Sequence, residues 1–164
     1  MRLSNIILTI SLLASLQGIA QTEDNNDITL ALQIHNEARE EVGLEAISWS
    51  EDLAKEAEIY AEKLAKTNRF VHCKKTPHGE NLYWYSATHV FPLAEASQAW
   101  YDEISDYKYR KCCGPKFSET GHYTQMIWHN TTEVGIGVAI SAKGTTYVVA
   151  RYNPSGNYIG QFPY

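Results

Sequence analysis

The sequence predicts an α+β domain in which helices come first and a two-stranded hairpin comes last. Apolar residues recur with helical spacing between residues 28 and 107, and two strand-like runs follow at 134–142 and 146–151. The short link Lys143-Gly144 between these runs is typical of a β-hairpin. Because helices and strands are not regularly interleaved, the order favours a layered α+β domain over a doubly wound parallel sheet.

The first twenty residues have the features of an export signal. Arg2 precedes a mostly apolar run, and the small residues Gly18 and Ala20 provide a cleavage site. The run is too short to span a bilayer, and no other segment approaches the required length. A buried helix or a lipid-facing anchor is the alternative, but the acidic stretch that follows favours a signal. We expect a signal peptide over residues 1–20 and one secreted domain over residues 21–164, without a transmembrane segment.

The composition is acidic, which argues against a nucleic-acid partner. The formal net charge is −5, and removal of the signal takes away only Arg2, which leaves −6. No cluster of lysine and arginine offers a surface for phosphates. The residues after the signal are enough for a single domain with a buried core.

The first two predicted helices are amphipathic. Apolar and small residues recur at three- and four-residue spacing from Ile28 to Val42, and this helix is expected to end near Gly43. The second helix is expected to begin after Ser50, a favourable N-cap, with an apolar stripe that continues to Leu64. Each helix therefore has one face suited to packing against a core.

The third predicted helix follows Pro92 and carries a carboxylate on its apolar face. Trp100, Glu103 and Tyr107 share the spacing of that face. A carboxylate there needs a partner, because burial of an unpaired charge is costly. An exposed boundary acid paired with a lysine is the alternative, and the helical pattern does not separate the two. A short strand over residues 80–85 is expected before this helix.

Three more polar residues stand beside apolar segments and are candidates for a site. Glu80 begins the short strand, where simple exposure to water would explain it equally. His72 follows an apolar pair, and a lone histidine in such a place is more often hydrogen-bonded in a core than a ligand. His122 begins a short helix expected over residues 122–128, where capping or packing is the alternative.

Known catalytic motifs are absent. The sequence holds no His-Glu-x-x-His, no Gly-x-Ser-x-Gly and no phosphate-binding glycine loop. Cys112 and Cys113 are adjacent, so the Pro-Cys-x-x-Cys of the zinc deaminases is missing. Cys73 stands beside His72, but neighbours on an extended backbone point to opposite faces, which argues against a cysteine-protease pair.

The three cysteines allow at most one disulfide and leave one thiol over. Adjacent cysteines rarely bridge each other, so we expect Cys73 to pair with Cys112 or Cys113 in the oxidising environment of an exported protein. A chain without any disulfide is also compatible with these spacings.

Five segments match short motifs that occur together in one family. They are residues 121–128 with 133–137, residues 147–157, residues 79–82, His35-Asn36 with Arg39, and residues 100–103. Together they resemble the CAP superfamily, or SCP domain, which comprises cysteine-rich secretory proteins, antigen 5 proteins and plant pathogenesis-related class 1 proteins. The resemblance covers about residues 28–164, and the low cysteine count is similar to that of the cysteine-poor members.

The resemblance implies a three-layer α-β-α sandwich with two histidines and two glutamates in a central cleft. The motifs place the tetrad at His72, Glu80, Glu103 and His122. The first histidine matches His72 better than His78, because the family's residue ends a Phe-Val stretch. Two imidazoles can bind a divalent metal such as zinc, and the carboxylates can orient them.

For function, the resemblance implies a secreted binding module for sterols, other lipids or an extracellular protein partner. The aromatic residues Tyr83, Trp84, Tyr85 and Phe91 would supply apolar contacts, although about half of them are better explained as core. A secreted factor with a vestigial site is the second possibility, and a metal-dependent hydrolase or protease is the third. Asn130 is in a glycosylation sequon, which could carry a glycan in a eukaryote.

Overall fold

The computed structural model of the protein describes residues 25–87, 89–114 and 117–164. The signal peptide predicted over residues 1–20 lies outside these ranges. Within them, no helix combines the length and the apolar character that crossing a membrane requires.

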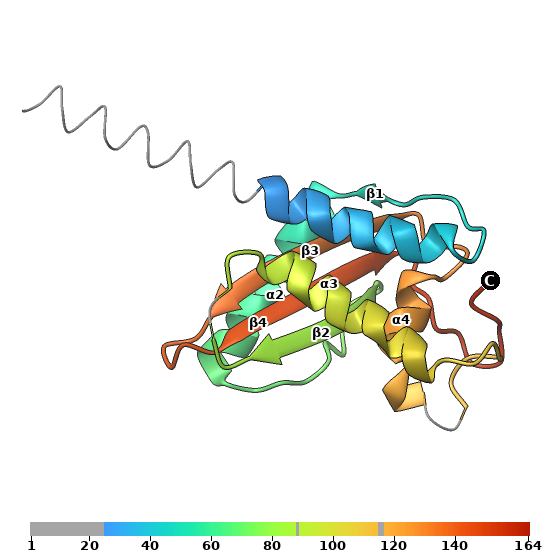
Figure 1. The fold of residues 1–164 in the computed structure, drawn as a ribbon. Helices are drawn as coiled ribbons and strands as arrows, with labels where there is room; N and C mark the ends of the chain where they lie inside the picture. The colour runs from blue at the N-terminus through green and yellow to red at the C-terminus, as the bar shows by residue number, and fades with distance from the viewer. Residues whose placement is uncertain (1–24, 88, 115–116) are drawn as a thin grey trace, which may run out of the picture.

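The protein is a three-layer α-β-α sandwich, which confirms the predicted fold class (Figure 1). A helix over residues 25–40 and α3 (Pro92–Asp102) cover one face of a central sheet, and α2 (Glu51–Thr67) covers the other. One apolar cluster, which includes Trp100, lies between the sheet and the two helices on its first face, the helix over residues 25–40 and α3. A second cluster, which includes Leu64, lies between the sheet and α2.

The sheet has four strands in the order β1-β3-β4-β2. They are β1 (Ser48–Trp49), β2 (Gly79–Tyr85), β3 (Glu133–Ile140) and β4 (Thr146–Asn153). As predicted, β3 and β4 form an antiparallel hairpin; β2 pairs antiparallel with β4, and β1 pairs parallel with β3. The sequence pattern did not predict β1, because two residues are too few to show a strand period.

Two glycines of β3 let α2 lie directly on the sheet. A Cβ atom on Gly135 would be 2.1 Å from the main-chain nitrogen of Ala54, and one on Gly137 would be 2.2 Å from that of Glu58. Ser50 caps the helix as predicted, since its side chain accepts a hydrogen bond from a main-chain N–H of the first turn. The sequence therefore fixes both where α2 begins and how closely it packs.

A buried arginine ties the N-terminal helix to the chain around the end of α4 (Gly121–Met126). Arg39 is 2% exposed, and burial lowers the pKa of its guanidinium to about 10, so it stays charged at neutral pH. Four main-chain carbonyl oxygens accept hydrogen bonds from it at 2.8–3.1 Å: those of Glu45, Met126, Trp128 and Thr131. Met126 is the last residue of α4, so this cation satisfies a carbonyl at a helix C-terminus, where main-chain partners are lacking.

The predicted third helix is wrong in its last turn. α3 ends at Asp102, and Glu103 begins a 3₁₀ helix that runs to Asp106. Such tightening is common where an α-helix ends. Glu103 therefore does not lie on an α-helical stripe. Its carboxylate does have a partner, as predicted, because it accepts a hydrogen bond from His122.

The predicted disulfide pairing is also wrong. Cys112 and Cys113 are bonded to each other, and Cys73 is a free thiol. Main-chain hydrogen bonds hold Cys112 against Gln161 and Gly160 of the C-terminal segment, whereas Cys73 packs against the apolar cluster next to α2. The predicted partners thus belong to different parts of the fold.

Candidate functional site

A cleft of about 640 Å³ opens between the loop before β2, the first turn of α4 and the C-terminal segment. Three of the four predicted site residues, His72, Glu80 and His122, line this cleft. Glu103 contacts His122 from the 3₁₀ helix after α3. The fold therefore brings the four residues together as two His–Glu pairs.

In the first pair, a buried carboxylate holds His72 in place. The side chain of Glu80 is 5% exposed. Its Oε1 accepts hydrogen bonds from Nδ1 of His72 at 2.6 Å and from the N–H of Cys73 at 2.9 Å, and its Oε2 accepts one from the guanidinium of Arg151. Burial alone would raise the pKa of the Glu80 carboxyl, but these donors and the Arg151 charge outweigh it and hold the pKa below its usual value. Glu80 is therefore ionised at neutral pH.

The second pair repeats this arrangement with an added role at a helix start. Oε1 of Glu103 accepts a hydrogen bond from Nδ1 of His122 at 2.6 Å. Its Oε2 accepts from the main-chain N–H groups of His122 at 2.9 Å and Tyr123 at 3.0 Å. The N-cap residue of α4 makes no side-chain cap of its own, so Glu103 satisfies the first amides of that helix. One carboxylate thus fixes both the α4 backbone and the imidazole it carries.

Both imidazoles are held through Nδ1, which leaves Nε2 of each ring available as an acceptor. A carboxylate on one ring nitrogen fixes the tautomer and makes the other nitrogen a better ligand, as around zinc-bound histidines. The side chains of His72 and His122 are 64% and 31% exposed, so an ion in the cleft could reach them. Two imidazole nitrogens oriented in this way are suitable ligands for a zinc-like ion.

Two imidazoles would fill only part of a zinc coordination sphere, which usually has four ligands. Across residues 25–87, 89–114 and 117–164, no three side chains of His, Cys, Asp and Glu gather as a complete metal-binding group. The remaining positions would thus belong to water or to a bound molecule, and metal affinity is expected to be modest.

His78, the alternative to His72, lines the same cleft but has different contacts. Its Nε2 lies 3.6 Å from a carboxylate oxygen of Glu56, and its Nδ1 is buried with no hydrogen-bond partner in the described part of the chain. The structure thus pairs His72, and not His78, with Glu80. His78 can therefore serve as a control for His72 within the same cleft.

A buried polar network supports the cleft from the core. The amide nitrogen of Asn81 donates to the carbonyl of His122 at 3.1 Å and to the hydroxyl oxygen of Tyr152 at 3.0 Å. That hydroxyl donates to Nε2 of His35 at 2.9 Å, and Nδ1 of His35 donates to the carbonyl of Ala31 at 2.8 Å. The network links the N-terminal helix, the sheet and α4, and it requires a neutral His35.

Acidification is expected to destabilise the fold through His35. Burial, which dominates over the hydrogen bond to Ala31, lowers the pKa of His35 to about 4. An unfolded histidine titrates at about 6.5, so the unfolded chain takes up the proton first. The contribution of His35 to the free energy of unfolding is therefore complete above about pH 6.5 and is lost as the pH falls to about 4, by roughly 3 kcal/mol.

Urea unfolding at several pH values between these limits measures this loss. His35→Gln removes the titrating group and should flatten the pH dependence of the unfolding free energy, whereas His129→Gln, at an exposed histidine, should not. Equal slopes for wild type and His35→Gln would contradict the assignment.

Three of the four predicted lipid-contacting residues lie in β2 on opposite faces, and the fourth lies outside that strand. Tyr83 and Tyr85 pack against the cluster that contains Trp100, and their ring centroids are 5.6 Å apart. Trp84 is 50% exposed and its ring centroid lies 6.3 Å from that of Phe70. Phe91 lines a separate groove beside α3. Successive side chains of a strand point to opposite faces, so these residues do not form one surface.

Two residues that support the site are not among the predicted ones: Arg151 and Asn81. Arg151 is 3% exposed and lies in β4 between buried residues. A charged residue inside an otherwise apolar strand is the signal that predicts a buried partner, here Glu80. Asn81 follows Glu80 in the strand and is 1% exposed, but nothing in the sequence pattern marks it as buried.

Comparison with known proteins places the chain in a family. Residues 32–152 match the family model described as CAP, the cysteine-rich secretory protein family. The Golgi-associated plant pathogenesis-related protein 1 of Homo sapiens is 37% identical over 134 residues, which cover 79% of this chain and 84% of that protein. Pathogenesis-related leaf protein 4 of Solanum lycopersicum is 35% identical over 166 residues and covers 100% of both chains. The crystal structure of NaASP2 with Zn²⁺ has a TM-score of 0.72 and 27% identity, over 83% of each chain. The chain therefore belongs to the CAP family of cysteine-rich secretory proteins.

Proposed function

We propose that the protein is a secreted binding domain whose cleft holds a divalent, zinc-like ion between His72 and His122. The observation that carries this proposal is the common form of the two pairs: each Nδ1 donates to a carboxylate, and each Nε2 is left for a ligand. The zinc named for NaASP2 and the secretory name of the family support it. When bound, the ion would supply a positive charge that attracts an oxygen ligand into the cleft.

The residues of the cleft support binding better than nucleophilic catalysis. Cys73 lines the cleft, but Nδ1 of the neighbouring His72 donates its proton to Glu80 and so cannot accept one from this thiol. A nucleophile usually needs a base within hydrogen-bond reach. Metal-dependent hydrolysis remains as the alternative. It would be favoured if the protein cleaved a peptide in the presence of zinc and both His72→Ala and His122→Ala lost this activity.

Calorimetric titration with zinc tests the proposal. Tag-free protein, treated with a chelator and then dialysed, should bind one zinc ion per chain with modest affinity. No saturable heat of binding would remove the metal-binding function, while the fold would stand.

An apolar ligand is a second candidate, and an exposed patch beside the cleft favours it. Phe70, Val71 and Trp84 are 44%, 47% and 50% exposed, and the first two directly precede His72 in the chain. We call these three residues the Phe70 patch. Adjacent exposed apolar side chains are typical of sites that bind lipids or proteins.

Trp84→Ala is expected to weaken uptake of a labelled sterol or fatty acid at least about tenfold, because a buried aromatic side chain contributes on the order of 1.5–3 kcal/mol. Equilibrium binding measures this effect. Ile159→Ala is the matched control, since Ile159 is 87% exposed and outside the patch. Uptake that is absent in the wild type, or equal in both variants, would contradict a lipid site at the Phe70 patch.

A further inference from the structure

The outer edge of β3 is covered by another strand only where β3 begins. β1 pairs with it at two residues, Glu133 and Val134. In the described part of the chain, no strand pairs with the outer edge beyond that point. An open edge presents main-chain N–H and C=O groups that can pair with another extended chain.

Alternation along the strand identifies the groups that this edge presents. On the outer side, the N–H of Ser50 donates to the carbonyl of Val134. On the inner side, just after β3, the N–H of Ser141 donates to the carbonyl of Thr145. Main-chain direction alternates along an antiparallel strand, so the even-numbered residues face outward. The N–H and C=O of Val138 therefore point away from β4.

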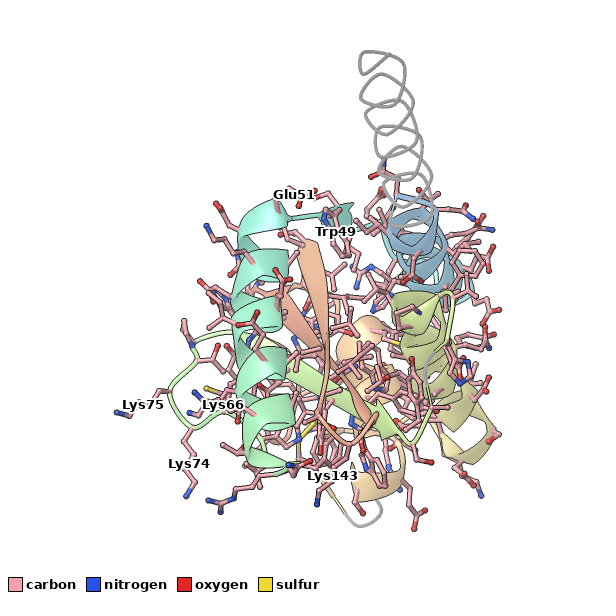
Figure 2. The ribbon with its side chains drawn as sticks, turned by 90° about the vertical axis from the view of Figure 1, so that its left-hand side faces the viewer. Trp49, Glu51, Lys66, Lys74, Lys75 and Lys143 are labelled. Atoms are coloured by element: carbon pink, nitrogen blue, oxygen red, sulfur yellow. A yellow bond between two sulfur atoms is a disulfide. The ribbon has the colours of Figure 1, made fainter. Side chains whose placement is uncertain are left out.

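A groove of about 820 Å³ lies along this edge, with Ile136, Gly137 and Val138 on its floor. α2 forms one wall, and the N-terminal helix together with the start of α3 forms the other. Figure 2 views the molecule from this side, with Trp49 and Glu51 near one end of the groove.

The two walls differ in chemistry. The α2 wall carries three exposed acids, Glu51, Asp52 and Glu58, against one cation, Lys55. Neither Asp52 nor Glu58 is in an ion pair within the described residues. The α2 wall therefore has a negative charge that favours a basic partner.

The opposite wall is mainly apolar at the groove. It presents Ile28, Val90 and Leu93, of which Val90 is 68% exposed. Its ionisable groups are engaged with α3: Asp27 accepts hydrogen bonds from the first amides of that helix, and His89 contacts Glu95.

We propose that this groove binds an extended peptide of alternating basic and apolar residues, which adds to β3 as a strand in line with β1. Successive side chains of such a strand point to opposite faces. One set therefore meets the acids of α2, and the other set meets the apolar wall. Main-chain hydrogen bonds to the β3 edge provide affinity, and the two walls provide the sequence preference.

A capped peptide of alternating lysine and valine is the probe, and fluorescence polarisation with the full-length chain is the measurement. It should bind saturably, and affinity should fall with added salt. A peptide of the same composition with its lysines and valines in two separate blocks should bind at least about tenfold more weakly, as should an alternating glutamate–valine peptide.

Variants of the edge separate strand pairing from simple charge attraction. Val138→Pro removes an outward N–H, a change that edge strands tolerate, and should weaken binding about tenfold relative to Val138→Ala, which keeps the N–H. Glu58→Gln should weaken binding about threefold, whereas Glu40→Gln, at an exposed acid outside the groove, should not. Thermal unfolding of each variant checks that the fold is retained.

Three results would overturn the proposal. The first is equal binding of the alternating and block peptides, which would indicate charge attraction alone. The second is equal binding by Val138→Pro and Val138→Ala. The third is a dimer in sedimentation that Val138→Pro disrupts, because the edge would then pair with a second copy of the chain.

Discussion

Replacing Arg39 with alanine is expected to lower the free energy of unfolding by about 3–5 kcal/mol, because a buried charge that joins three segments is lost. Four carbonyl oxygens accept hydrogen bonds from this guanidinium. Without it the buried carbonyls of Met126 and Thr131 would lose this donor, at a cost of roughly 1–3 kcal/mol for each group that water cannot reach, whereas Trp128 would keep the N–H of Thr131.

Urea unfolding followed by tryptophan fluorescence measures this effect. Arg39→Lys should recover only part of the loss, since an ammonium group cannot reproduce the forked geometry of a guanidinium. Arg69→Ala is the matched control, because Arg69 is exposed and its removal should change stability by less than about 0.5 kcal/mol. A comparable change in Arg39→Ala and Arg69→Ala would show that the hydrogen bonds of the Arg39 guanidinium do not stabilise the fold.

The second large effect is the loss of zinc affinity when a histidine of the cleft is replaced. His72→Ala and His122→Ala are each expected to lower zinc affinity at least about a hundredfold, since a site with two protein ligands loses half of them. Glu103→Gln should lower it by about tenfold or more, because the carboxylate orients His122 and makes its free nitrogen a better ligand. Isothermal titration calorimetry at neutral pH gives these affinities.

His78→Ala is the matched control for this series. His78 lines the same cleft, but no carboxylate of the tetrad contacts it, so its removal should leave zinc affinity unchanged. Zinc binding that survives both His72→Ala and His122→Ala, or that disappears in His78→Ala, would place the ion elsewhere.

The fold was predictable where a period repeats often enough to be recognised. The stripe and Ser50 cap of α2, and the two runs of the hairpin, carry several repeats each, and the structure confirms them. β1 has two residues and carries no period. The end of α3 was not predictable, because Glu103 and Tyr107 continue the apolar spacing after the backbone has already tightened into a 3₁₀ turn.

The contacts of the site depend on distances that no local pattern contains. Glu80 and Arg151 are 71 positions apart, and Glu103 and His122 are 19 apart. A carboxylate in an apolar pattern predicts that a partner exists, but not which residue it is. The resemblance to a family indicated the residue types of the tetrad, whereas the pairing of each histidine with a particular glutamate required the structure.

The disulfide is another contact that no local sequence pattern predicts. Counting them predicts one disulfide at most, and the general rarity of adjacent pairs led to Cys73 as a partner. Hydrogen bonds between Cys112 and the C-terminal segment decide the outcome, because they fix its loop in a part of the fold that Cys73 does not share.

X-ray absorption spectroscopy of the zinc-loaded protein tests the central claim most directly, because it reports the atoms bound to the ion. The two His–Glu pairs predict two imidazole ligands at about 2.0–2.1 Å with oxygen atoms completing the sphere. They predict further that the imidazole signal is reduced in both His72→Ala and His122→Ala. A sulfur ligand at about 2.3 Å would show that Cys73 binds the ion, and an unchanged imidazole signal in both variants would show that the two pairs do not hold it.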